Sequence, residues 1–221
     1  MNKVHFDGYK KFKTEYYENN KELFDDLIDS QSPHTMVITC SDSRVQPSKI
    51  LSAAAGEIFI ARNIGNIVPP YKRTQGATQA AIEYAVNVLK VEHIVILGHS
   101  NCGACKHMYH VKTEEEEKIE LSHVEEWLKL AYPAKNNSLL ECFADPSKER
   151  SEVTEKNNIQ LSVQRLMSYP YIIEALEQQK LKLHGWWYDI GTGEMQVYSY
   201  STKMFESIEL HKEEKELKDV L

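Results

Sequence analysis

His93-Ile-Val-Ile-Leu97 is a short run of apolar residues that ends at Gly98-His99. An apolar run without alternation is typical of a strand that is buried on both faces, as in a parallel sheet. Met36-Val-Ile-Thr-Cys40 and Glu57-Ile-Phe-Ile-Ala-Arg62 are two further β-prone runs. Between the run that ends at Arg62 and the run that begins at His93, apolar residues recur at helical intervals from Thr74 to about Lys90. Strands that alternate with a helix indicate an α/β fold with a parallel sheet.

Both ends of the chain add elements to this sheet. Residues from about Gly8 to Ser30 are charged, with aromatic and aliphatic residues at helical spacing. They predict an N-terminal helical arm over residues 1–30. Leu181 to Tyr188 and Met195 to Tyr200 flank Gly191-Thr-Gly193, which predicts a C-terminal β-hairpin.

The remaining sequence is mostly helical in pattern. Val124, Trp127, Leu128 and Ala131 share one helical face, and Asn157 to Lys180 predicts a helix interrupted near Tyr169-Pro170. No internal repeat or low-complexity linker divides the chain. We therefore expect residues 1–221 to form a single α/β domain, with a central, mostly parallel β-sheet flanked by helices.

Composition excludes several classes of partner. The chain has 221 residues, with 26 basic and 33 acidic side chains and a net charge of −7, which argues against a nucleic-acid surface. No apolar run approaches the roughly 20 residues of a membrane-spanning helix, so we expect no membrane partner. The first residues lack the apolar stretch of a signal peptide. Four cysteines in a chain of this length do not indicate a disulfide scaffold. We expect a cytoplasmic protein.

Two motifs at the ends of predicted strands indicate a metal site. Cys40-Ser-Asp42-Ser-Arg44 follows the first strand, and His99-Ser-Asn-Cys102 follows the third. Ligands collect beyond the carboxyl ends of parallel strands, so these motifs are expected to meet there. Two thiolates and one imidazole are ligand types that Zn²⁺ prefers, and three protein ligands leave one tetrahedral position for water. Cys40, His99 and Cys102 are therefore predicted to hold one catalytic Zn²⁺.

Asp42 and Arg44 are the predicted catalytic pair beside this metal. Asp42 is placed to accept a hydrogen bond from a zinc-bound hydroxyl, or alternatively to become a fourth zinc ligand and close the site. If the segment stays extended, Arg44 lies on the same side and can hold the carboxylate by a bidentate pair, away from the metal. The simpler interpretation of the pair is a structural salt bridge beside a turn.

These motifs resemble the β-class carbonic anhydrases, most closely the plant-like branch. The resemblance is carried in order by Cys40-Ser-Asp-Ser-Arg44, Arg62-Asn63, Ala81-Ile-Glu-Tyr-Ala85 and Gly98-His-Ser-Asn-Cys102-Gly103. It extends from about Gln31 to Ala134. It implies a zinc lyase that uses zinc-bound hydroxide to convert CO₂ reversibly into bicarbonate and a proton.

Further substrate-binding residues are implied by the resemblance. The amide of Gln31 matches one that contacts substrate, and Phe59 and Tyr84 match residues that wall the CO₂ pocket and orient that amide. The backbone N–H of Gly103 is expected to help bind bicarbonate. Phe59 and Tyr84 are expected to come from a second subunit, because the family builds its sites at a dimer interface. The expected partners are therefore CO₂ or bicarbonate and at least one further copy of the chain, as a homodimer or a homotetramer.

The resemblance also predicts how the site rests near neutral pH. Some members of the family move the counterpart of Asp42 onto zinc, and bicarbonate stabilises this closed state in a pocket beside the metal. That pocket depends on a tryptophan at the position of Val37. Without the indole, the closed state lacks a packing surface and a hydrogen-bond donor. We expect Asp42 to stay paired with Arg44.

Three other functions remain open at this point. The same scaffold can carry a related zinc hydrolase, for example one that acts on carbon disulfide. A non-enzymatic zinc-binding module is a second alternative. A thiol redox protein is the third, because Cys102-Gly-Ala-Cys105 has CxxC spacing. We expect Cys105 to be a packing thiol, and we assign no role to Cys142, His107 or His110.

Overall fold

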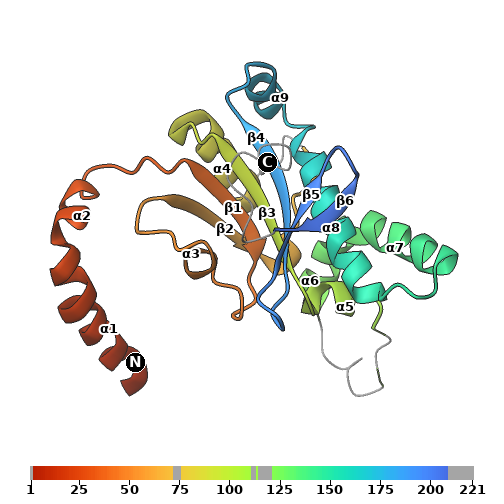
Figure 1. Ribbon diagram of the computed structural model, residues 1–221, viewed down its shortest axis with the longest axis horizontal. Helices are drawn as coiled ribbons and strands as arrows, with labels where there is room; N and C mark the ends of the chain where they lie inside the picture. Colours follow the sequence, from red (N-terminus) through yellow and green to blue (C-terminus); the bar gives the residue numbers. More distant parts are fainter. Residues whose placement is uncertain (1, 72–75, 111–112, 114–120, 209–221) are drawn as a thin grey trace.

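A six-stranded sheet forms the centre of the protein in a computed structural model, which describes residues 2–71, 76–110, 113 and 121–208. The strand order is β2-β1-β3-β4-β5-β6 (Figure 1). The strands are β1 Thr35–Cys40, β2 Ile58–Asn63, β3 His93–His99, β4 Lys182–Tyr188, β5 Met195–Ser199 and β6 Met204–Ser207. Strands β2, β1, β3 and β4 are parallel, and β5 and β6 add two antiparallel strands at one edge. The predicted mostly parallel sheet and the hairpin of β4 with β5 are confirmed.

Helices flank the sheet and continue beyond it. The α-helices are α1 Lys3–Lys11, α2 Lys21–Asp26, α3 Pro47–Ile50, α4 Ala77–Tyr84, α5 Gly103–His107, α6 Ser122–Leu128, α7 Tyr132–Ala144, α8 Arg150–Leu166 and α9 Pro170–Glu177. Shorter π and 3₁₀ segments are η1 Phe12–Tyr17, η2 Glu18–Asn20, η3 Ile64–Asn66, η4 Ala85–Leu89 and η6 Lys129–Ala131. Within the described residues, no helix is both long and apolar enough to cross a bilayer.

The core follows from the alternation of side chains along each strand. Met36 and Ile38 of β1 point to one face, where they pack with residues of α4, α8 and α9 such as Ile159. Val37 points to the other face and packs with Ile50 of α3 and with Leu51, directly after it. Both faces of β1 are therefore buried, which explains its continuous apolar sequence.

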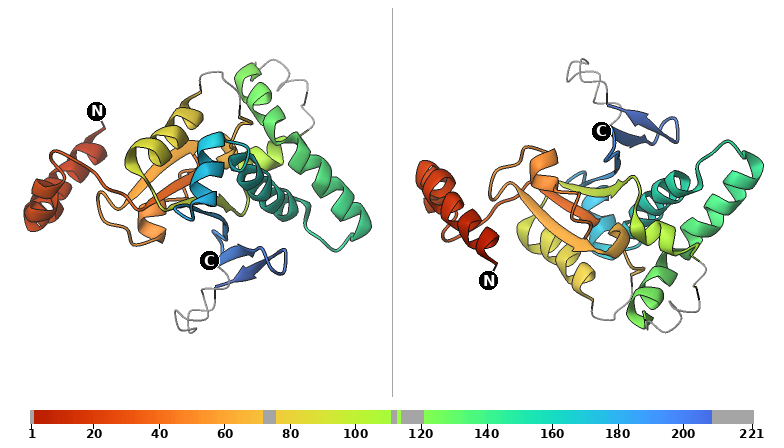
Figure 2. Two further views of the ribbon diagram at one scale, coloured as in Figure 1. Left: turned by 90° about the horizontal axis from the view of Figure 1, so that it is seen from above. Right: turned by 90° about the horizontal axis from the view of Figure 1, so that it is seen from below.

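Helices α1 and α2 form the predicted N-terminal arm. They lie away from the sheet in every view, on the opposite side of the protein from α7 and α8 (Figures 1 and 2). No residue of α1 is buried. The arm therefore adds little to the core of its own chain.

Several elements differ from the sequence-based prediction. Helix α8 begins at Arg150 rather than near Asn157, because the Glu149 side chain caps it by accepting a hydrogen bond from the Ser151 N–H at 3.4 Å. Pro170 is the first residue of α9, where its missing N–H is no loss. Helix α7 and strand β6 were not predicted. The expected helix start at Thr74 lies outside the described residues.

Candidate metal centre and active site

The side chains of Cys40, His99 and Cys102 converge at one end of the sheet. Cys40 and His99 are the last residues of the neighbouring parallel strands β1 and β3, and Cys102 is the residue directly before α5. Their ligand atoms all lie within 4.8 Å of one another, and all three residues are buried. A bond from the Thr39 hydroxyl to the Leu97 carbonyl, 2.9 Å long, ties the two strand ends together.

The geometry of this cluster fits a zinc ion. Tetrahedral zinc with two sulfur ligands and one nitrogen ligand holds its ligand atoms about 3.5–3.8 Å apart. The His99 Nδ1–H donates to the Ser100 carbonyl at 2.9 Å, which leaves the lone pair on Nε2. That Nε2 atom is buried and has no hydrogen-bond partner among the described residues. A buried lone pair beside two thiols is the arrangement expected of a metal ligand.

The loop after β1 is shaped by Arg62, at the end of β2. Its guanidinium donates to the carbonyl of Cys40 at 2.8 and 3.1 Å, and to those of Asp42 and Val45 at 2.8 Å each. The Gly65 N–H points at the Cys40 sulfur at 3.4 Å, and Gly65 has a positive φ of 79°, which favours glycine. From the sequence, Arg62 was recognised only as part of the family pattern, and no role was predicted for it.

Asp42 is held by Arg44 beside the candidate metal ligands. The Arg44 Nε and Nη2 atoms donate to the two carboxylate oxygens at 2.9 and 2.7 Å, and the Arg44 backbone N–H adds a bond of 3.0 Å. Arg44 Nη2 also donates to the carbonyl of Asn101 at 3.1 Å. These bonds hold the pKa of Asp42 well below its usual range. The carboxylate also lies near the cluster, with Oδ2 at 3.8 Å from His99 Nε2.

The surroundings of the two thiols raise their pKa values. A hydrogen bond with the Cys102 thiol, together with burial, raises the pKa of Cys40 to about 12. The pKa of Cys102 is also raised, chiefly by its contact with Cys105 and by burial. Reactive redox cysteines have lowered pKa values instead. All four cysteines are free thiols, so Cys102 and Cys105 form no disulfide here.

Gln31, Phe59 and Tyr84 do not join this cluster within one chain. Cys40 pairs with Asn63 in the sheet, whereas Phe59 pairs with Met36, four residues back along both strands. Four residues of strand span about 13 Å. Gln31 lies further back still, exposed in the segment before β1. The rings of Phe59 and Tyr84 contact each other with centroids 6.0 Å apart, and Tyr84 is 45% exposed.

Two glycines near the site have different surroundings. Gly103 is the first residue of α5, is exposed, and has open space where a Cβ would lie. Its backbone is therefore accessible beside Cys102. At Gly98 a Cβ would lie 2.6 Å from Ile159 Cδ1, so glycine here makes room for α8.

Glu155 is a buried acid that the sequence did not single out. It lies on α8 and is 3% exposed. Its Oε1 accepts the backbone N–H of Cys102 at 2.9 Å, and its Oε2 accepts the indole N–H of Trp187 at 3.1 Å. Burial raises the pKa of Glu155 to about 7, against the effect of these two donors. A glutamate in a polar helical stretch carries no sequence signal for such a role.

Comparison with known proteins identifies the family. A family model for carbonic anhydrases matches residues 35–195, which include the whole metal cluster. The chain belongs to the carbonic anhydrase family. A carbonic anhydrase of Helicobacter pylori strain J99 is 36% identical over 208 residues, covering 92% of this chain and 93% of that protein.

The class of this carbonic anhydrase follows from further matches. Beta carbonic anhydrase 3 of Arabidopsis thaliana is 36% identical over 197 residues, covering 89% of this chain and 76% of that protein. The structure of the β-carbonic anhydrase CcaA has a TM-score of 0.83 and 35% identity, covering 93% of this chain and 98% of that one. A tetrameric β-carbonic anhydrase of Sordaria macrospora has a TM-score of 0.77 and 32% identity, with coverages of 88% and 94%. This carbonic anhydrase is of the β class, whose members are zinc enzymes.

Proposed function

We propose that this chain catalyses the reversible hydration of CO₂ to bicarbonate and a proton, with one zinc ion held by Cys40, His99 and Cys102. The observation that carries the proposal is the buried cluster of these three ligand groups, with an ionised Asp42 held beside it. A structural zinc site normally has a fourth protein ligand, whereas here the neighbouring carboxylate is engaged by Arg44.

In the proposal, each residue around the cluster has a separate role in the reaction. Zinc, when bound, supplies a Lewis acid that makes water a better nucleophile near neutral pH. Asp42 stays ionised and offers a carboxylate oxygen to accept a hydrogen bond from the attacking water, which orients it. Arg44 fixes the carboxylate by its two parallel bonds. In the proposal, the backbone N–H of the exposed residue Gly103 donates to bicarbonate.

The proposed active form contains at least two copies of the chain. Gln31, Phe59 and Tyr84 belong to the substrate site in the proposal, yet they lie toward the far ends of β1 and β2 from the cluster of their own chain. A second copy is therefore needed to bring them to it. The exposed side chains of Tyr84 and Val88 offer an apolar surface for that contact. The tetrameric enzyme of Sordaria macrospora supports a homodimer or a homotetramer.

The proposed resting state near neutral pH keeps Asp42 with Arg44. Two observations support this state. Arg44 binds both carboxylate oxygens of Asp42, and the fully buried position 37 holds valine rather than tryptophan. A crystal structure near pH 7 is expected to show the same pair. Finding Asp42 as a zinc ligand there would contradict this proposal.

We also propose a cytoplasmic location. Free cysteines persist in reducing compartments, and all four cysteines of this chain are free thiols. Fractionation of the source cells with an antibody against the protein tests the location directly.

A stopped-flow assay of CO₂ hydration tests the function. The zinc-loaded protein is expected to be active, the chelator-treated protein inactive, and zinc to restore the activity. Cys40→Ser, His99→Ala and Cys102→Ser are each expected to lose both zinc and activity, because each removes a ligand. Full zinc occupancy in the Cys40→Ser protein would contradict the ligand assignment.

Parallel assays with CO₂ and with carbon disulfide separate the alternatives. A zinc-loaded protein that hydrates no CO₂ but hydrolyses carbon disulfide would be the related hydrolase, and one that does neither would be a zinc-binding module. Cys105→Ser is the control for thiol redox chemistry. The CO₂ proposal predicts that Cys105→Ser keeps its CO₂ hydration activity. A thiol redox protein would lose its redox activity in Cys105→Ser and would keep that activity after treatment with the chelator.

A further inference from the structure

Glu155 links the metal cluster to the core of the protein. It comes from α8, yet its carboxylate binds the residue before α5 and a side chain of β4. Both oxygens accept an N–H, one from the Cys102 backbone and one from the Trp187 indole. The described residues offer it no ion pair within salt-bridge distance. Burying such a carboxylate is costly, and the two hydrogen bonds offset part of this cost.

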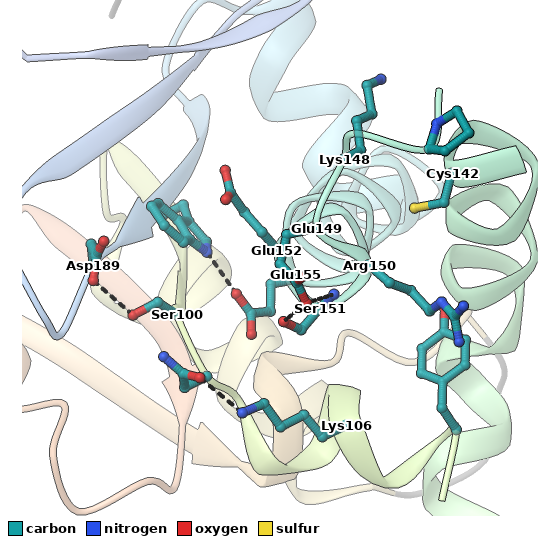
Figure 3. Close-up of a pocket in the computed structure, with 14 residues that line it drawn as sticks. Ser100, Lys106, Cys142, Lys148, Glu149, Arg150, Ser151, Glu152, Glu155 and Asp189 are labelled. Carbon is teal, nitrogen blue, oxygen red and sulfur yellow. Dashed lines mark hydrogen bonds between the residues drawn. The ribbon is translucent and has the colours of Figure 1, made fainter. Parts of the chain in front are cut away.

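The carboxylate lies at the wall of a polar pocket of about 820 Å³. Figure 3 shows Glu155 on α8, with Ser100 and Asp189 to one side of it and Lys106 below it. Ser100 and Cys102 lie on either side of Asn101, in the short segment that contains two of the three metal ligands. The pocket side of this segment is thus held by hydrogen bonds that Ser100 donates to Asp189, Lys106 donates to Asn101, and the Cys102 N–H donates to Glu155.

We propose that Glu155 is a positioning residue for the zinc ligand Cys102, an inference that rests on the proposed zinc site. The Cys102 N–H belongs to the same residue as the ligand sulfur, so fixing that peptide group limits the directions in which Sγ can point. The indole of Trp187 in turn fixes the carboxylate. Outer groups of this kind orient metal ligands and raise the affinity for the metal.

The packing of α8 supports this role. Ile159 lies one helical turn after Glu155 and is fully buried. It fits against β3 only because Gly98, directly before His99, has no Cβ. Helix α8 therefore closely approaches the segment that carries His99 and Cys102, and the position of Glu155 is set by the core.

A set of zinc-affinity measurements tests the proposal. An amide has one acceptor oxygen and one donor nitrogen, so in Glu155→Gln one of the two N–H groups must face another donor. We expect the zinc dissociation constant, measured by chelator competition, to rise about 10- to 100-fold. Trp187→Phe keeps the contact with Cys102, so its affinity is expected to change far less. Glu155→Gln combined with Trp187→Phe is expected to regain most of the affinity, because the amide oxygen can then face Cys102.

Two controls make the result specific. Glu152→Gln removes a carboxylate from the same helix and the same pocket, where it pairs with Lys156, and its zinc affinity is expected to stay unchanged. The urea unfolding midpoint of the zinc-free protein reports any general loss of stability. The thiolate-to-metal absorption band of Co²⁺-substituted protein is expected to shift in Glu155→Gln and not in Glu152→Gln.

The outcomes are distinguishable. An unchanged zinc dissociation constant in Glu155→Gln would overturn the positioning role. So would a double variant that is as weak as Glu155→Gln, because the charge rather than the hydrogen bond would then matter. If Cys102→Ser kept full zinc affinity, the proposed zinc site itself would be wrong, independently of Glu155.

Discussion

Gly98→Ala is expected to weaken both the fold and the metal centre, because Gly98 is where α8 touches β3. A Cβ at this position would lie 2.6 Å from Ile159 Cδ1 and 2.7 Å from Ile159 Cγ1, well inside ordinary contact distance. Ile159 is fully buried, so its side chain cannot swing into solvent. The added methyl group must instead push α8 away from the strand or force Ile159 out of its rotamer.

The magnitude follows from known effects of overpacking. An extra methyl group in a well-packed core costs about 1–3 kcal/mol. Ile159→Ala removes both Cδ1 and Cγ1, the two atoms that the added Cβ would meet, and by itself costs about 2–5 kcal/mol. When combined, Gly98→Ala and Ile159→Ala are expected to cost less than the sum of the two single changes, because the contact is then gone. A coupling of about 1 kcal/mol is in the range measured for residues in contact.

Urea unfolding at one fixed protein concentration measures these costs, since the stability of an oligomer depends on concentration. Gly8→Ala is the matched control, because a Cβ at Gly8 meets no atom within 4 Å and the residue lies in the exposed helix α1. It is expected to cause no loss of stability. Chelator competition adds a second measurement, in which Gly98→Ala weakens zinc binding because Glu155 moves with Ile159. Strictly additive costs, or a Gly98→Ala protein as stable as the wild type, would refute this reasoning.

Three further predictions concern catalysis, pH and assembly. Asp42→Asn and Arg44→Ala are each expected to lower kcat/KM about 100-fold or more, while the zinc content stays near one per chain. Arg44→Lys is expected to be intermediate, because lysine lacks the planar guanidinium that binds both carboxylate oxygens. Normal pH–rate profiles in these variants would reduce the pair to a structural salt bridge. Burial, with the nearby His93 ring, lowers the pKa of His184 from 6.5 to about 4, so the unfolded chain binds a proton first as the pH falls. Stability is therefore expected to drop by about 3 kcal/mol between about pH 6.5 and pH 4, and unfolding of His184→Asn is expected to lack this part of the pH dependence; equal slopes in the two proteins would contradict it. Gln31→Ala is expected to raise KM without loss of zinc, and sedimentation is expected to show a dimer or larger species; a fully active monomer would rule out the shared site.

Position in the sheet explains why the ligand cluster was predictable. Cys40 and His99 each end an apolar run, and parallel strands bring such ends together at one edge. The affinity of thiolates and imidazole for zinc is a property of the residues themselves. The pairing of Asp42 with Arg44 was also predictable. The two residues are only two positions apart in the chain, so they lie close together whatever the fold of the rest.

Contacts between distant segments were not predictable in the same way. Arg62 shapes the loop after Cys40 by binding backbone carbonyls, and any arginine at a strand end has the donors to do so. The start of α8 at Arg150 was missed because its cap is a glutamate, which is a less common capping residue than serine or aspartate. Strand β6 was missed because a four-residue edge strand carries too few residues for a periodic signal.

The sequence by itself determined the parallel sheet, the three candidate zinc ligands and the pair beside them, because residue chemistry and strand periodicity are local properties. The tertiary structure alone decided that Glu155, 53 residues from Cys102, binds its backbone, and that Gly98 makes room for Ile159. It also placed Gln31 and Phe59 away from the cluster of their own chain. These facts depend on how helices and strands pack against one another, and packing distances are set by the whole core rather than by any one segment.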